Sequence, residues 1–311
     1  MYEYEHDRLC DDILADTDLI GEALTVLGPD RAVPSCPGWT TGRMLIHLHQ
    51  ALSWGATIVE KRATEFLPPS ATEEPGEEHA ETPGEAHART HGETHGETHG
   101  DWTRRVDSLA HQVSDSDGSL GRDTASQVSW LRAAAERMVT ALREAGPHAT
   151  VWTTFGAQEA RFWSSWAAAE VAVHRADLDL VRGRRVRIDT GTALDAVDLW
   201  LHAIAAPSAA MFFDPRLAEM RGRGETFGFR AVDAPDPARG LWRVTRTPEG
   251  LLTERPAPDR WASDTSPSVT VHGTADELLL LLKRRTRVES SPVTVSGESQ
   301  LLDHWLDHVL T

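Results

Sequence analysis

The sequence predicts an α+β protein in which a bundle of four long helices is followed by a small C-terminal α+β domain. Through the first part of the chain, apolar residues recur at helical intervals. After about Gly222 the pattern changes to the alternation of strands, with Gly and Pro turns between them. Helices and strands segregated along a chain are typical of the α+β class. We place the two domains at residues 1–212 and 213–311.

The helices of the first domain are predicted from this periodicity and from signals at their ends. The expected segments are residues 5–27, Thr40 or Thr41 to about 63, 119–144, 160–181 and 192–206. Gly28-Pro29 ends the first segment, and a threonine hydroxyl caps the second. Long helices in this order predict an antiparallel bundle.

The second domain is predicted to alternate short strands with two helices. The expected strands are residues 226–232, 240–247, 250–257, 268–273 and 292–297. Helices are expected over 274–285 and 298–310. Thr274 and Glu277 fit a capping box at the start of the first of these.

Residues 64–101 interrupt the helical pattern and consist mainly of Glu, His, Gly, Thr and Pro. Such a segment buries too little apolar surface to offset its ordering entropy, so we interpret it as a flexible insertion. It contains THGETHGETHG, with His91, His95 and His99 four residues apart. Each glycine costs about 1 kcal/mol in a helix relative to Ala, so the repeat is not expected to align its histidines. A metal-storage role centred on it is kept as a rival hypothesis.

The composition limits the partners of the protein. The net charge of −17 argues against nucleic acid, whose phosphates require a basic surface. No apolar run reaches the roughly 20 residues that a membrane-spanning helix needs. The acidic N-terminus lacks the features of a signal peptide, so a cytoplasmic protein with free Cys10 and Cys36 is expected. Lys occurs only at 61 and 283, a bias towards Arg that indicates a GC-rich genome such as that of an actinomycete.

Two helical segments carry groups that could bind a metal. Glu170 and His174 are spaced i, i+4 within an Ala- and Val-rich stretch, so both project from one face. His47 and His49 point about 200° apart, so at most one of them faces the bundle interior. Spacing alone does not establish metal binding. Glu170 and His174 could simply form a hydrogen bond with each other, and the inward-facing one of His47 and His49 could be a hydrogen-bonded core residue. Taken together, one His and Glu-x₃-His form a His₂Glu set with a fourth position open, as in catalytic zinc sites.

Three stretches resemble the mycothiol-dependent maleylpyruvate isomerase family, a branch of the DinB-like helix-bundle superfamily. They are CPGWTTGRMLIHLHQALSW, AEVAVHRADLDLVRG and VHGTADELLLLLKRR followed by VTVSGESQLLDHW. The resemblance covers nearly the whole chain except residues 64–118. It implies a DinB-like four-helix bundle followed by the C-terminal α+β domain of the family.

The resemblance also implies the residues of the site. His47, eight residues after Trp39, would bind zinc together with Glu170 and His174. Arg285 falls where the family places a basic residue that reaches the active site from the second domain. Lys283-Arg284-Arg285 replaces the aromatic-Gly-Arg of the family at this point. Arg175 and Asp177 are candidates to support the ligands, with a solvated helix end as the alternative, and Cys36 is interpreted as structural.

The expected function is that of a zinc-dependent enzyme that uses mycothiol as a thiolate nucleophile. Zinc stabilises a bound thiolate, which would attack a small electrophilic substrate. S-transfer is preferred because of the long insertion, and cis–trans isomerisation of the maleylpyruvate type is the alternative. The competing hypothesis, from another class of function, is a non-catalytic metal- or ligand-binding protein. The implied partners are the thiol and a small molecule, with no nucleic acid or membrane.

Overall fold

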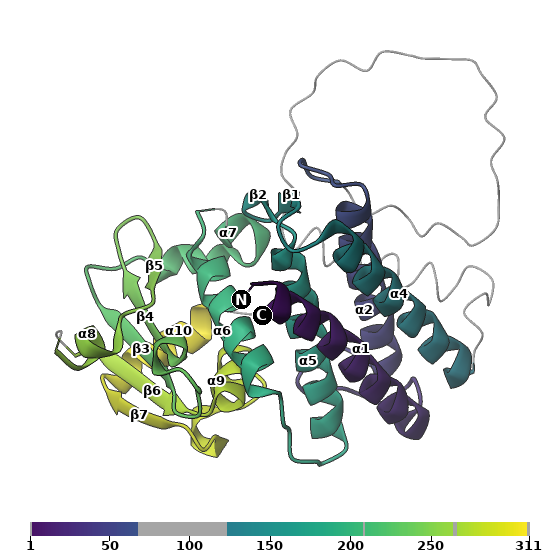
Figure 1. Cartoon of the computed structure of the whole chain (residues 1–311). Helices are drawn as coiled ribbons and strands as arrows, with labels where there is room; N and C mark the ends of the chain where they lie inside the picture. The colour runs from purple at the N-terminus through teal and green to yellow at the C-terminus, as the bar shows by residue number, and fades with distance from the viewer. Residues whose placement is uncertain (1, 68–122, 208, 264–265, 310–311) are drawn as a thin grey trace.

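The computed structural model describes residues 2–67, 123–207, 209–263 and 266–309, with helices first and a sheet second (Figure 1). The long helices are α1 (Tyr2–Leu27), α2 (Thr41–Glu60), α4 (Thr124–Ala145), α5 (Arg161–Val181) and α6 (Thr190–Ala205). Their bounds agree with the predicted segments to within a few residues, except that 119–122 lie outside the described part. The predicted α+β class is confirmed.

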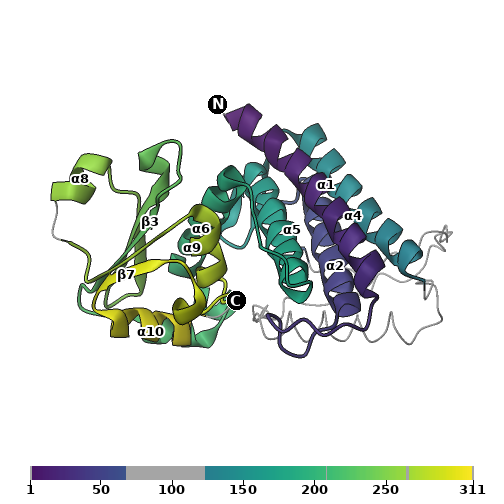
Figure 2. The same cartoon turned by 90° about the horizontal axis from the view of Figure 1, so that it is seen from below.

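Helices α1, α2, α4 and α5 form the bundle around one apolar core (Figures 1 and 2). Each helix contributes side chains that are fully buried there, among them Ile13, Leu48, Met138 and Val171. α1 ends at Gly28, which has a φ of 73° and whose N–H donates to the Leu24 carbonyl at 2.8 Å. Thr40 caps α2, because its side chain accepts a hydrogen bond from the Arg43 N–H.

A two-stranded hairpin between α4 and α5 was not predicted. It pairs β1 (Thr150–Thr153) with β2 (Gly156–Glu159). Every residue of β2 is exposed, and its sequence GAQE has no apolar alternation. The hairpin therefore lacks the pattern from which strands are recognised in a sequence.

The C-terminal part is a five-stranded sheet in the order β5-β4-β3-β6-β7. The strands are β3 (Thr226–Ala231), β4 (Leu241–Arg246), β5 (Leu251–Glu254), β6 (Val269–Gly273) and β7 (Thr294–Gly297), each within a predicted segment. β3 and β6 pair in parallel, and the other neighbours pair antiparallel. Two helices belong to this part, α9 (Ala275–Leu282), which begins with the predicted capping box, and α10 (Ser299–His308). Short elements complete it: α7 (Ala209–Phe212), α8 (Pro258–Ser263), η1 (Pro215–Met220), η2 (Pro237–Gly240) and η3 (Val288–Ser290).

α6 and α9 lie between the sheet and the bundle (Figure 2). The apolar core of the sheet continues through α6 to Ala172 and Ala176 on α5. Asp195 of α6 also forms ion pairs at 2.6 Å with Arg8 of α1 and Arg239 of η2. α6 thus contacts both parts of the chain, and a domain boundary at residue 212 stays a prediction.

Residues 68–101 of the predicted insertion, including the THGE repeat, lie outside the described residues. Among the helices of the described ranges, none is both long and apolar enough to cross a membrane.

Candidate metal centre

The three predicted ligands lie together between α2 and α5. Their ligand atoms all lie within 4.8 Å of one another. His47 Nε2 is 2.8 Å from Glu170 Oε1, and His174 Nε2 is 3.5 Å from the same oxygen. His49 points away, and its ring stacks on that of Trp130 with 3.3 Å between centroids. The structure therefore brings His47 to Glu170 and His174, and places His49 at the contact of α2 with α4.

The three ligands are not equally buried. The side chains of His47 and Glu170 are 15% and 24% exposed, whereas that of His174 is 7% exposed. His174 is therefore the most enclosed of the three side chains, and the exposed edge of the cluster belongs to His47 and Glu170.

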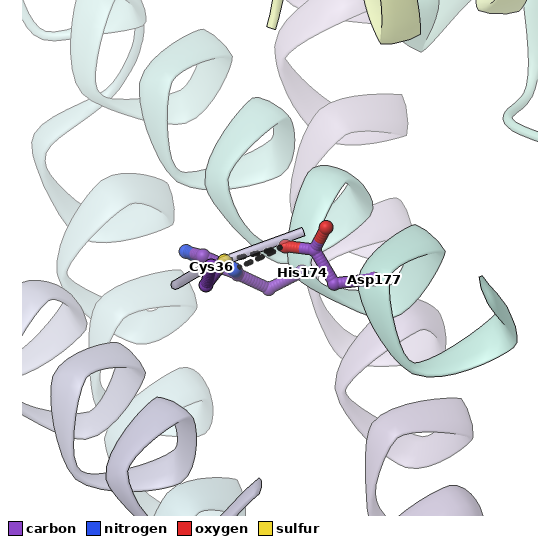
Figure 3. A group of neighbouring side chains, drawn as sticks. All are labelled: Cys36, His174 and Asp177. Atoms are coloured by element: carbon purple, nitrogen blue, oxygen red, sulfur yellow. Dashed lines mark hydrogen bonds and ion pairs between the residues drawn. The ribbon is translucent and has the colours of Figure 1, made fainter. Parts of the chain in front are cut away.

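Asp177 fixes the orientation of His174. Its Oδ2 atom lies 2.9 Å from His174 Nδ1 (Figure 3). The opposite ring nitrogen, Nε2, faces Glu170. The side chain of Asp177 is completely buried, which excludes the alternative of a solvated helix end. Arg175, the other candidate for support, instead pairs with Asp16 and Asp179.

Arg285 reaches this point from the turn after α9. Its Nε donates to Asp177 Oδ1 and its Nη2 to Asp177 Oδ2, both at 3.0 Å. Such a two-point pair is the strongest geometry between guanidinium and carboxylate. Burial alone would raise the pKa of Asp177, but His174 and Arg285 outweigh burial and lower that pKa. Arg285 therefore lies beside the cluster with its charge engaged by Asp177.

The protonation states of the ligands follow from the same contacts. Burial opposes the charged form of each group. For Glu170 the hydrogen bonds from His174 and His47 outweigh burial, and its pKa lies well below the usual range. For His174 the contacts with Asp177, Cys36 and Glu170 outweigh burial, and its pKa is raised well above the usual value. For His47 burial prevails, and its pKa is lowered.

Cys36, interpreted from the sequence as structural, belongs to this group of contacts. Its Sγ lies 3.4 Å from Asp177 Oδ2 (Figure 3) and 3.5 Å from Arg285 Nη2. Cys36, His174 and Asp177 are a second set of close ligand atoms. A cation there would have to displace the Arg285 guanidinium, which contacts both Asp177 oxygens. The set formed by His47, Glu170 and His174 is therefore the better candidate.

Tryptophans close to the site in sequence or space divide into two groups. Trp39 contacts the cluster: its ring stacks on that of His174 at 5.8 Å, and its centroid lies 4.9 Å from that of His47. Trp54 and Trp163 instead pack against each other at 5.5 Å in the bundle core. Trp39 covers one side of the candidate site, and the others contribute apolar packing.

Lys283 stands out in the sequence only as one of two lysines and as part of the Lys283-Arg284-Arg285 departure from the family pattern. Its ammonium lies 3.5 Å from the ring centroid of Trp200. Burial lowers the pKa of Lys283 to about 7, and the nearby charges that also act on it are those of Glu170 and Arg285.

The donor set fits a divalent metal of the zinc type. Two imidazole nitrogens and one carboxylate converge, and a carboxylate bonded to the far nitrogen orients His174. The carboxylate–histidine pair is the usual support of a metal-binding imidazole. The residues therefore fit the ion that the resemblance implies.

Comparisons with known proteins agree with this fold. The family model described as the mycothiol maleylpyruvate isomerase N-terminal domain matches residues 10–179, more than half of the chain. A crystal structure of the mycothiol-dependent maleylpyruvate isomerase matches 94% of this chain and 94% of that chain, with 12% identity and a TM-score of 0.51. A histidine-to-alanine mutant of that enzyme matches equally, with 13% identity. At such identities the structural likeness shows the fold. No curated protein matched the chain.

Proposed function

Because this chain belongs to the mycothiol maleylpyruvate isomerase family, we propose that it is a zinc-dependent enzyme with mycothiol as its thiol co-substrate. The observation that carries the proposal is the convergence of His47, Glu170 and His174 on one point with an exposed side. Three protein ligands and an open position are what a catalytic metal site requires, whereas structural sites are closed.

The chemistry that a zinc ion supplies in such a site is the acidification of a thiol at its open position. The protein's own residues prepare that position. Asp177 holds His174 Nδ1, so that Nε2 is the nitrogen presented to the ion. Arg285 holds Asp177 in turn, and Trp39 covers the His174 ring. These contacts fix the ligands before the ion binds, which is the preorganisation that a reactive site needs.

The thiolate of the co-substrate would then form a C–S bond with an electrophilic carbon of the substrate. In S-transfer the bond is kept, and the carbanion takes a proton or a leaving group departs. S-transfer is the outcome we propose. In isomerisation the adduct rotates about the former double bond and expels the thiolate, so no thiol is consumed. This second candidate is favoured by the names of the matched family and of the similar solved structures.

The proposal is tested with His174→Ala and with His49→Phe as its control. His174→Ala should lose stoichiometric zinc and thiol-dependent activity together, measured by elemental analysis and by turnover of an enone in the presence of mycothiol. His49→Phe keeps the stacking on Trp130 and should keep both. Retention of zinc and activity by His174→Ala would refute the site. A zinc-loaded protein that ignores mycothiol would favour the non-catalytic rival.

The two outcomes are separated by following thiol and substrate in one reaction. With a cis-enone acid, a transferase consumes one mycothiol per turnover and yields a thioether, which mass spectrometry detects. An isomerase yields the trans acid and leaves the mycothiol concentration unchanged.

A further inference from the structure

The five-stranded sheet carries a cavity on the face that turns away from α10. Phe227 and Phe229 pack against Trp305 of α10, so Gly228 between them faces the other side of the sheet. Thr270 of β6 is the register partner of Gly228 and shares that side. The cavity has a volume of about 250 Å³, and its lining residues are Trp261, Ser266, Pro267, Thr270, His272, Ser296 and Gly297. None of them belongs to the candidate metal centre, so the cavity is separate from that site.

One wall of the cavity is apolar because Gly228 has no side chain. A Cβ atom at Gly228 would lie 2.7 Å from Trp261 Cη2 and 2.8 Å from Pro267 Cγ, closer than Cβ atoms approach other atoms in proteins. The indole and the proline ring therefore occupy the space directly above the strand. Together they give the cavity a flat aromatic wall with an apolar ring beside it.

The strands β6 and β7 supply polar groups to the same cavity. Thr270 and Ser296 are register partners, and His272 follows Thr270 two residues later on the same face of β6. Thr270 is only 9% exposed. Across the part of the chain that the structure describes, no hydrogen bond joins its hydroxyl to another residue, and the same holds for Ser296 and the ring of His272. A buried hydroxyl normally has a partner, and the cavity provides the space for one.

The lining residues carry no full charge at neutral pH. They include no Asp, Glu, Lys or Arg. Burial lowers the pKa of His272, and the charge of Arg230, its register partner on β3, lowers it further, so the imidazole is neutral. A neutral imidazole donates through one nitrogen and accepts through the other, and a hydroxyl group does both. Such a lining suits uncharged hydroxyl groups better than an anion or a cation.

We propose that this cavity binds a carbohydrate, as one pyranose ring whose apolar face lies against Trp261. That face of the ring exposes C–H bonds, whose partial positive charge suits the negative face of an indole. The hydroxyl groups of the sugar are then available to Thr270, His272 and Ser296. A nucleobase fits less well, because it has two apolar faces and the cavity has one apolar wall. At about 30 Å³ per water molecule the cavity has room for roughly eight waters, enough for a single sugar ring.

Saturation-transfer NMR on the full-length protein tests the proposal. The probes are methyl β-D-galactopyranoside, a ring with one apolar face, and sorbitol, an open-chain polyol without such a face. The galactoside should bind with a Kd of about 1 mM, the affinity expected for a ligand of that size. Sorbitol should bind at least about threefold more weakly, because it cannot stack on the indole. Inorganic phosphate at the same concentration should not displace the galactoside.

Matched substitutions locate the bound sugar. Thr270→Val removes a hydroxyl at nearly constant shape and should weaken binding about three- to tenfold, the loss of one hydrogen bond. Trp261→Ala should weaken it about tenfold. Thr294→Val is the control, because Thr294 lies on β7 outside the lining and should leave binding unchanged. Ser296→Ala, at an exposed position, is the second hydroxyl variant and replaces Thr270→Val if thermal denaturation shows that the latter is unfolded.

Four results would overturn the proposal. They are a wild type that transfers no saturation to the galactoside, equal binding of sorbitol, displacement by phosphate, and hydroxyl variants that bind as Thr294→Val does. Zinc content and thiol-dependent turnover should be the same in Trp261→Ala as in the wild type, since the cavity and the candidate metal centre share no residue. The carbohydrate site therefore stands or falls independently of the proposed function.

Discussion

Asp177 is the residue on which the chemistry of the candidate site depends most. It is completely buried and joins His174 to Arg285, so it sets both the orientation of the imidazole and the position of the guanidinium. A buried carboxylate between two such donors remains ionised, which agrees with its lowered pKa. Replacing it therefore affects a proposed metal ligand, His174, and a cation, Arg285, at once.

Asp177→Asn should weaken zinc binding by about 10- to 100-fold, the usual effect of losing a carboxylate that supports a metal-binding His. It should also lower the free energy of unfolding by about 3 kcal/mol, because the buried Arg285 would lose its counter-charge. Chelator competition and urea denaturation measure the two effects. Asp179→Asn is the control, because Asp179 lies on the same helix and pairs with Arg175, not with a histidine. It should leave the zinc affinity unchanged, and an equal loss in both variants would refute the role of Asp177.

The raised pKa of His174 predicts proton release on metal binding. With a pKa well above the usual 6.5, His174 is protonated at pH 7 in the metal-free protein and must lose that proton to bind zinc. His47, with a lowered pKa, and Glu170, with a strongly lowered one, are already deprotonated. About one proton per zinc should therefore be released at pH 7, and below the pKa of His174 the zinc affinity should fall about tenfold per pH unit. Calorimetry in buffers of different ionisation enthalpy measures this release, and a value of zero would contradict the prediction.

The ligand residues could be predicted from the sequence because two of them share one helix. An i, i+4 spacing fixes Glu170 and His174 on one face, and the family motif selects His47 over His49. Their function as zinc ligands stays a prediction. The contacts of Cys36 and Lys283 could not be predicted, because each depends on how a loop or turn packs against a distant helix, α5 for Cys36 and α6 for Lys283. Local periodicity carries no information about such packing.

At the scale of elements, helix α2 and the loop before it position three side chains at the site. The loop brings Cys36 and Trp39 to the His174 side, and α2 presents His47 two turns after its N-cap. Thr40 is the residue that separates loop from helix, since its side chain accepts from the Arg43 N–H at 3.2 Å. Thr41, the other predicted cap, is buried and donates to the Gly28 carbonyl.

Thr40→Ala should lower the free energy of unfolding by about 1 kcal/mol, the usual cost of removing a helix cap. Thr40→Ser retains the hydroxyl and should lose only a small part of that stability. Urea denaturation measures both. The zinc stoichiometry should not change, because His47 lies in the regular part of α2. If Thr40→Ala and Thr40→Ser are equally stable, the cap contributes nothing measurable.

The elements that the sequence failed to predict are short and carry little apolar pattern. The hairpin β1–β2 and the helix α8 have four to six residues each, and every residue of β2 is exposed. The strands β3, β4 and β6 could be predicted because several of their apolar residues are buried. Phe227 and Phe229, for example, alternate with more polar or smaller residues and pack against Trp305. Burial in the folded protein can be recognised from a sequence only where it produces a clear pattern of apolar positions.

At the scale of the whole molecule, the candidate site is assembled from both parts of the chain. α2 and α5 provide the proposed ligands, while the turn after α9 provides Arg285. The shared core through α6 and the ion pairs of Asp195 hold these parts together. The chemistry of the site therefore depends on docking of the C-terminal part as well as on the bundle.

Removing residues 71–100 should leave the candidate metal centre intact, although it removes the densest histidine cluster of the sequence. His47, Glu170 and His174 are fixed by helices on either side of that segment, and none of their contacts named above requires it. The shortened protein should retain about one tightly bound zinc ion per chain after washing with a weak chelator, the stoichiometry of a single three-ligand site. Elemental analysis of full-length and shortened protein measures this, with His174→Ala in the shortened chain as the control that should lose the ion. If the deletion abolishes most of the tightly bound metal and the histidine substitution does not, the metal is held by the THGE repeat, and the protein stores metal.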